Sequence, residues 1–163
     1  MAATLPNVSH EHHERLMHHL DAMTAVGDLV GAAPSELRPR VDEVAAFLNG
    51  LLLPHMEAAE GTLYPVLERL LQNRHSMTPM RREHAEIRQL VAELVRLQLK
   101  LDDGPLHTGE SVALRRVIFR LYAMLKVHLA EEQLYLGIIE QGVSAESAEK
   151  LAAAMDHVGI AEF

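Results

Sequence analysis

The chain has 163 residues, 15 of them basic and 23 acidic, so its formal net charge at neutral pH is −8. This acidic balance argues against nucleic acid or an anionic membrane as the main partner. The absence of cysteine excludes disulfides, thiolate ligands and a cysteine nucleophile. No apolar run approaches the roughly 20 residues of a membrane span, and the first residues lack the features of a secretory signal. We therefore expect a cytoplasmic protein with one domain over residues 1–163.

Apolar residues recur with helical spacing along most of the chain, without an alternating strand pattern. Ser35 and Thr78 are the expected N-caps of two helices. Pro54 and Pro65 fall inside one predicted helix and should disturb it locally, because proline lacks a backbone donor. The pattern predicts an all-α, antiparallel up-down-up-down four-helix bundle with a short C-terminal helix. The five predicted helices span residues 8–30, 36–71, 78–101, 109–140 and 144–157.

Histidine is unusually frequent, with 11 residues in the chain. His128 and Glu132 lie one helical turn apart on the apolar side of the fourth predicted helix. An imidazole and a carboxylate in this relation can chelate a divalent ion. A surface pair has the same spacing, but a glutamate among core positions is costly without a metal or hydrogen-bond partner.

The other three long helices each add a histidine to their apolar side: His13 in the first, His55 in the second and His84 in the third. Each of these alone could be an ordinary core histidine. Metal sites in helix bundles are built from facing helices, so the four together predict a metal site in the bundle core. His12 is an alternative to His13, because a small rotation of the helix decides between them.

Four stretches with these histidines resemble a known family: HERLMHHL, LPHMEAAEGTLYP, RREHAEIRQL and HLAEEQLY, in this order. Over nearly its full length the chain resembles the hemerythrin-like (HHE cation-binding) family. The resemblance implies an antiparallel four-helix bundle that holds a non-haem di-iron centre. Carried over by position, the implied ligands are His13, His55, His84, His128 and Glu132.

One position departs from the family pattern, which expects a bridging glutamate four residues after His55, where this chain has Ala59. Glu60 follows at about 140° from His55 on a regular helix and would not reach the site. A π-bulge or kink near Gly61, where Pro65 leaves a carbonyl unpaired, could swing Glu60 inward as a substitute metal ligand. Without a second carboxylate, the charge of two ferrous ions is poorly balanced, so a mononuclear or asymmetric site is also open.

Histidine and carboxylate ligands without sulfur suit iron or manganese and do not exclude zinc. Tyr135, two turns from His128, could bind the cofactor or hydrogen-bond Glu132, or it could be a core tyrosine. The preferred hypothesis is an iron protein that binds or senses O₂, NO or peroxide. One alternative is a peroxide-consuming iron enzyme, although no catalytic residue beyond the metal site is visible. The other is a bundle that has lost the di-iron site and binds another cofactor or a protein partner.

Overall fold

The computed structural model describes the backbone of residues 5–102 and 104–156. It describes their side chains from Arg15 onward, except at residues 145, 152, 155 and 156. Within this part of the chain all regular structure is helical. The elements, with π-helical segments labelled η, are α1 (Leu5–Leu29), α2 (Pro34–Phe47), η1 (Leu48–Leu52), α3 (Leu53–Ala58), η2 (Ala59–Leu63), α4 (Tyr64–Leu70), α5 (Thr78–Lys100), α6 (Thr108–Gly142) and α7 (Ala145–Asp156).

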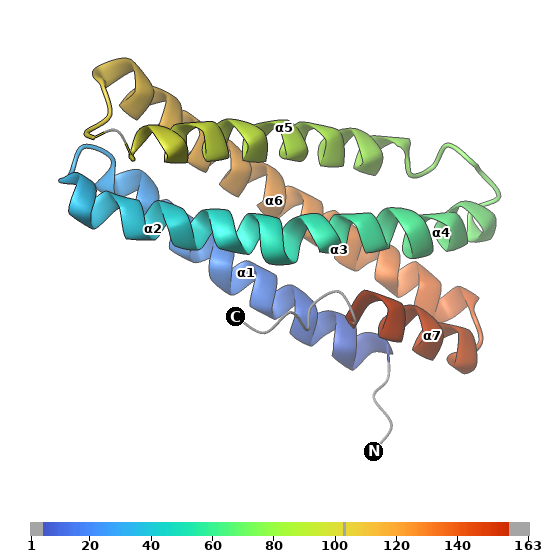
Figure 1. Cartoon of the computed structure of the whole chain (residues 1–163). Coiled ribbons are helices and arrows are strands. Elements are labelled where there is room, and N and C mark those ends of the chain that lie inside the picture. Colours follow the sequence, from blue (N-terminus) through green and yellow to red (C-terminus); the bar gives the residue numbers. More distant parts are fainter. Residues whose placement is uncertain (1–4, 103, 157–163) are drawn as a thin grey trace.

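These elements form four long rods, each antiparallel to the next: α1, the continuous run from α2 to α4, α5 and α6 (Figure 1). The longest helix, α6, packs against both α1 and α5, and the short α7 lies against α1 and η2. The predicted bundle with a short C-terminal helix is thereby confirmed. None of the described helices is long and apolar enough to cross a membrane.

Two helices begin earlier than their expected caps. Ala33 is the N-cap of α2, so Ser35 lies inside that helix, and Met77 rather than Thr78 is the N-cap of α5. In both helices a proline occupies one of the first two positions. Proline favours this place because its φ is already helical and the N–H it lacks would have no partner there. Each helix therefore starts early enough to place its proline in the first turn.

The disturbance expected at Pro54 and Pro65 of the second rod takes the form of π-helical turns, whereas Pro39, which also lies inside this rod, is part of the regular helix α2. The segment η1 ends two residues before Pro54, and η2 ends two residues before Pro65. In a regular helix each proline ring would crowd the carbonyl four residues earlier, which belongs to Gly50 or Gly61. A π-helical turn bonds residues five apart, and it thereby changes the rotation of every side chain that follows.

Two polar side chains support the backbone within these π-helical turns. The Asn49 side-chain amide donates to the carbonyl of Ala45 at 2.8 Å, and the Thr62 hydroxyl donates to the carbonyl of Ala58 at 2.6 Å. Both acceptors lie four residues upstream, where a regular helix would supply a backbone N–H. The side chains therefore satisfy carbonyl groups at the places where the helical ladder changes its spacing.

The apolar core is divided into two clusters by a layer of buried polar side chains. In α5, for example, Met80 belongs to one cluster and Ile87 to the other. His84 lies between them in the sequence and is completely buried. The described side chains that are both buried and polar are His55, His84, His128 and Glu132, which we call the polar layer.

Candidate metal centre

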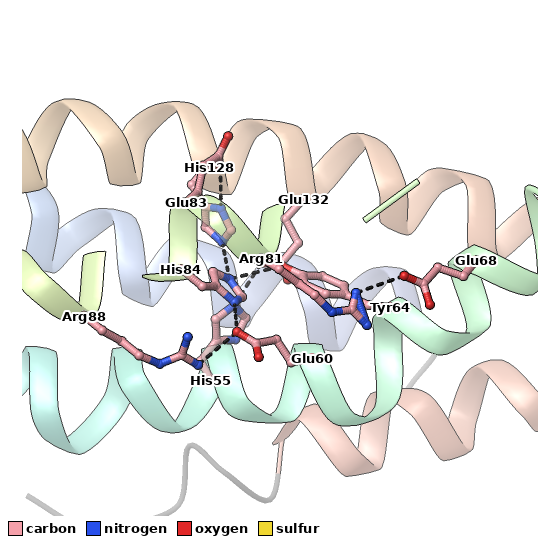
Figure 2. A network of polar contacts seen from close by, with 10 residues as sticks. All are labelled: His55, Glu60, Tyr64, Glu68, Arg81, Glu83, His84, Arg88, His128 and Glu132. Carbon is pink, nitrogen blue, oxygen red and sulfur yellow. Dashed lines mark hydrogen bonds and ion pairs between the residues drawn. The ribbon is translucent and has the colours of Figure 1, made fainter. Parts of the chain in front are cut away.

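The polar layer brings together side chains from three rods of the bundle. His55 comes from α3, His84 from α5, and His128 and Glu132 from α6 (Figure 2). Each is at most 1% exposed. Polar groups so deeply buried are costly unless they are hydrogen-bonded or bind a cation. The contacts of these four side chains therefore indicate whether hydrogen bonds satisfy the polar layer or whether it suits a cation.

The histidines of α5 and α6 point their Nε2 atoms at each other, 3.0 Å apart (Figure 2). Their outer nitrogens both meet carboxylates: His84 Nδ1 lies 2.6 Å from Glu60, and His128 Nδ1 lies 2.9 Å from Glu83. A carboxylate at Nδ1 favours the tautomer with the proton there, and in that neutral tautomer the Nε2 lone pair points inward. Two lone pairs at this distance repel unless a proton or a metal cation lies between them. Outer carboxylates orient imidazole ligands in protein metal sites in the same way.

The electrostatics of this pair favour a neutral His84 and a charged Glu60. Burial, and to a smaller extent the neighbouring His128, lowers the pKa of His84 to about 4, although Glu60 and Glu132 act in the opposite direction. Burial raises the pKa of Glu60, but hydrogen bonds from His84 and Arg88 outweigh this effect and leave that pKa below its usual value. A neutral imidazole is the form that binds metal, and His84 takes this form at neutral pH.

The second buried pair joins α3 to α6. His55 Nε2 lies 2.8 Å from Glu132 Oε2, and both side chains are 1% exposed. This contact places the glutamate predicted by the sequence inside the layer, one helical turn from His128. A carboxylate is therefore available at the depth of the three imidazoles.

Tyr64 completes the inner contacts and was missed by the sequence analysis. Its hydroxyl lies 3.1 Å from His84 Nε2, and its side chain is fully buried. Burial, reinforced by the charge of Glu132, raises the pKa of Tyr64 far above its usual value. The phenol therefore stays neutral and, in the metal-free chain, can donate to His84 Nε2. Tyr135 is half-buried against the second apolar cluster, and its role as a cofactor residue stays a prediction.

The π-helical turn η2 decides the position of Glu60. On a regular helix this residue would face away from His55, but in η2 its carboxylate meets His84 Nδ1 and Arg88, the latter at 2.9 Å. The side chain is 30% exposed, so it closes the outer edge of the polar layer. Ala59 is fully buried within the second apolar cluster. The expected bulge is present, whereas direct metal binding by Glu60 stays a prediction.

Ion pairs surround the layer on its outer side. Glu83, also missed from the sequence, reaches from α5 to α6 and is 29% exposed. Its neighbour Arg81 lies over the Tyr64 ring, 5.3 Å from the ring centre, and binds Glu68 at 3.0 Å (Figure 2). The signal available for Glu83 was its place beside His84, but the sequence does not show which helix it faces. These ion pairs place partly exposed charges along the outer side of the layer.

The predicted fourth histidine, His13, and its alternative His12 lie outside the described side chains. Among the side chains described, no group of three or more His, Asp or Glu residues is arranged to hold a metal ion. The inward donors are instead hydrogen-bonded in two pairs, His84 with His128 and His55 with Glu132. The chemistry of the donor set nevertheless fits a divalent cation, because it combines three imidazoles with a carboxylate and two of the rings are held by outer carboxylates.

A four-helix bundle with histidine and carboxylate side chains in a central layer belongs to the class of helical bundles whose metal and cofactor sites are formed by side chains on facing helices. The model of the hemerythrin HHE cation-binding domain matches residues 5–139. The chain therefore belongs to the hemerythrin HHE family, whose members bind metal cations, typically iron. Neither the curated proteins nor the solved structures gave a match.

Proposed function

We propose that the chain holds non-haem iron in the polar layer and uses it to bind or sense O₂, NO or peroxide. The main support is the facing pair of His84 and His128, whose outer nitrogens are held by Glu60 and Glu83. Membership of the hemerythrin HHE cation-binding family supports the binding of a metal cation. Imidazole and carboxylate donors without sulfur support iron or manganese over softer metals.

In this proposal His55, His84, His128 and Glu132 are metal ligands, and His13 supplies a fifth ligand from α1. Glu60 and Glu83 fix the tautomer and orientation of the His84 and His128 rings. Residues that hydrogen-bond to metal ligands commonly have this role. Removing such a residue typically weakens metal binding about 10- to 100-fold.

Charge balance favours a single iron or two of unequal affinity. Two ferrous ions bring four positive charges, whereas Glu132 is the one carboxylate within the layer itself. Glu60 and Glu83 add negative charge from the outer edge, but Arg88 neutralises part of it through its bond to Glu60. Ala59 offers no charge where the family pattern expects a bridging glutamate. A second divalent ion would therefore be held less tightly than the first.

The surroundings of the layer suit a reactive metal that must be kept from bulk water. The two apolar clusters cover it on both sides along the bundle axis. Iron held there would supply redox chemistry and the capacity to bind a small ligand. Tyr64 provides a neutral hydroxyl donor beside His84, and Glu60 links that ring to the protein surface through a partly exposed carboxylate.

Metal content per chain tests the proposal directly. Protein produced with added iron and washed with a weak chelator should retain iron by elemental analysis. His128→Ala should lose most of it, because the variant removes a buried donor from the layer. His75→Ala is the matched control, since that histidine is exposed between α4 and α5. Wild-type protein without iron, or iron retained in full by His128→Ala, would overturn the proposal.

The ligand is then tested on iron-loaded protein. Absorbance changes when the reduced protein meets O₂ or NO, absent from His128→Ala, support a binding or sensing role. Rapid consumption of peroxide that is lost in the same variant would favour the enzymatic alternative. Unchanged spectra with all three small molecules would contradict the sensing role while leaving iron binding intact.

A further inference from the structure

The outward face of α6 carries an apolar stripe that the other described helices leave largely uncovered, although the ring of Phe119 also lies against Gly27 of α1. Its large side chains are between 38% and 73% exposed. At about 100° per residue they fall within roughly 100° of the helix circumference. They therefore form one strip along most of this 35-residue helix. The members are Val112, Phe119, Val127, Leu134 and Ile138.

The side chains in the middle of the stripe are small enough for another helix to approach closely. Ala123 and Ala130 are exposed, and both lie within the same arc as the large side chains. Small residues between larger ones create the grooves into which the ridges of a second helix pack. The alternation of large and small side chains along the α6 stripe is thus typical of a surface that packs against another helix.

The apolar area of the stripe suits a small dimer interface. The exposed fractions of its large side chains leave roughly 400–500 Å² of apolar surface, within the range of about 300–600 Å² for the largest patch on a soluble monomer, which is often functional. Two such stripes facing each other would bury roughly 800–1,000 Å², so the flanking polar side chains must join the contact for it to pass the roughly 1,000 Å² of a specific interface. The other exposed large apolar side chains among the described residues, Leu71 and Leu99, lie outside α6.

The charges that flank the stripe indicate which partner fits it. The first half of the exposed face of α6 is basic: Arg116 lies within the arc of the stripe and Arg120 at its edge, while Arg115 donates to carbonyls at the C-terminal end of α1. The second half carries Glu131 and Glu140, and the central Lys126 is already paired with Asp21 of α1. A second copy in antiparallel orientation sets the basic half of one helix against the acidic half of the other. A parallel copy would place like charges together. The α6 stripe is therefore complementary to itself under a two-fold axis.

We propose that two copies of this chain pair through antiparallel α6 helices, with the two-fold axis close to Ala123 and Val127. This register brings Phe119 of one copy near Leu134 of the other, and Arg120 near Glu131. Arg120 already binds Glu86 of its own chain at 2.7 Å. Its guanidinium has further N–H donors for a second carboxylate, so both pairs can form together. The pairing is independent of the polar layer and of any metal.

Sedimentation equilibrium at several chain concentrations tests the pairing. Wild-type protein should approach twice the 18.1 kDa of one chain. Leu134→Glu should be monomeric, because it places a charge in the centre of each contact while its 73% exposure spares the monomer fold. Val127→Glu gives an independent second disruption. Leu99→Glu is the matched control, since Leu99 is 60% exposed on α5, and it should stay dimeric.

Far-ultraviolet circular dichroism should show that all of these variants keep the helical fold. A monomeric wild-type chain at every concentration would overturn the proposal. So would a dimer that persists in both folded stripe variants, because another surface would then make the contact.

A charge exchange tests the antiparallel register. Arg120→Glu and Glu131→Arg should each raise the dimer dissociation constant several-fold, since exposed ion pairs contribute modestly and each pair occurs twice in the dimer. The double variant should bind more tightly than either single variant, although Glu86 beside position 120 keeps it short of wild-type affinity. If the double variant binds no better than either single variant, Arg120 and Glu131 do not face each other and the register is wrong.

Discussion

Acid should destabilise the metal-free chain through His84. Its environment lowers the folded-state pKa from 6.5 to about 4, mainly by burial and then by the neighbouring His128. The unfolded chain takes up a proton at His84 below about pH 6.5, whereas the folded chain does not until about pH 4. Between these values the unfolded state binds more protons, so the free energy of unfolding falls as the pH falls.

The size of this effect follows from the two pKa values. By linkage, the free energy of unfolding should drop by about 2 kcal/mol between neutral pH and pH 5, and by about 3 kcal/mol at pH 4. A typical domain is stable by only 5–15 kcal/mol. No allowance for solvent screening is needed, because the His84 side chain is completely buried.

Urea unfolding in the presence of chelator, followed by circular dichroism, measures the loss. His84→Gln is the comparison, since an amide can make similar hydrogen bonds but does not titrate. The difference between wild type and variant removes the contribution of the other histidines, and above about pH 5 carboxylates such as Glu60 add little to it because they titrate below that range. Wild-type protein should lose about 2 kcal/mol more than the variant there. Parallel losses in the two proteins would refute the conclusion that folding excludes the proton from His84.

Three further predictions concern the metal. Glu83→Ala should raise the metal dissociation constant about 10- to 100-fold in a chelator competition. An unchanged constant would show that this carboxylate does not orient His128 for metal binding. Glu132→Ala should lower iron content more than Glu60→Ala, and equal losses would mean that the π-helical turn makes Glu60 a direct ligand. Tyr64→Phe should cost about 1 kcal/mol in urea unfolding for the lost hydrogen bond while iron content is kept; loss of iron would assign the phenol as a ligand.

The sequence by itself determined the bundle and the inward face of each helix, because helical periodicity records which residues of one helix share a side. The same periodicity placed His55, His84, His128 and Glu132 among apolar neighbours, and all four are buried. It also indicated a bulge before Pro65, because proline cannot continue the regular backbone ladder. These features depend on one helix at a time.

Only the tertiary structure decided how the polar side chains meet. Glu83 binds His128 rather than its own neighbour His84, and Glu60 binds His84 from another rod. Tyr64 reaches the polar layer although Tyr135 had the more suggestive spacing. Such contacts depend on the relative rotation and height of two helices, which packing of the whole bundle sets. A π-helical turn shifts both quantities for every residue beyond it, so the spacing along one helix does not reveal these partners.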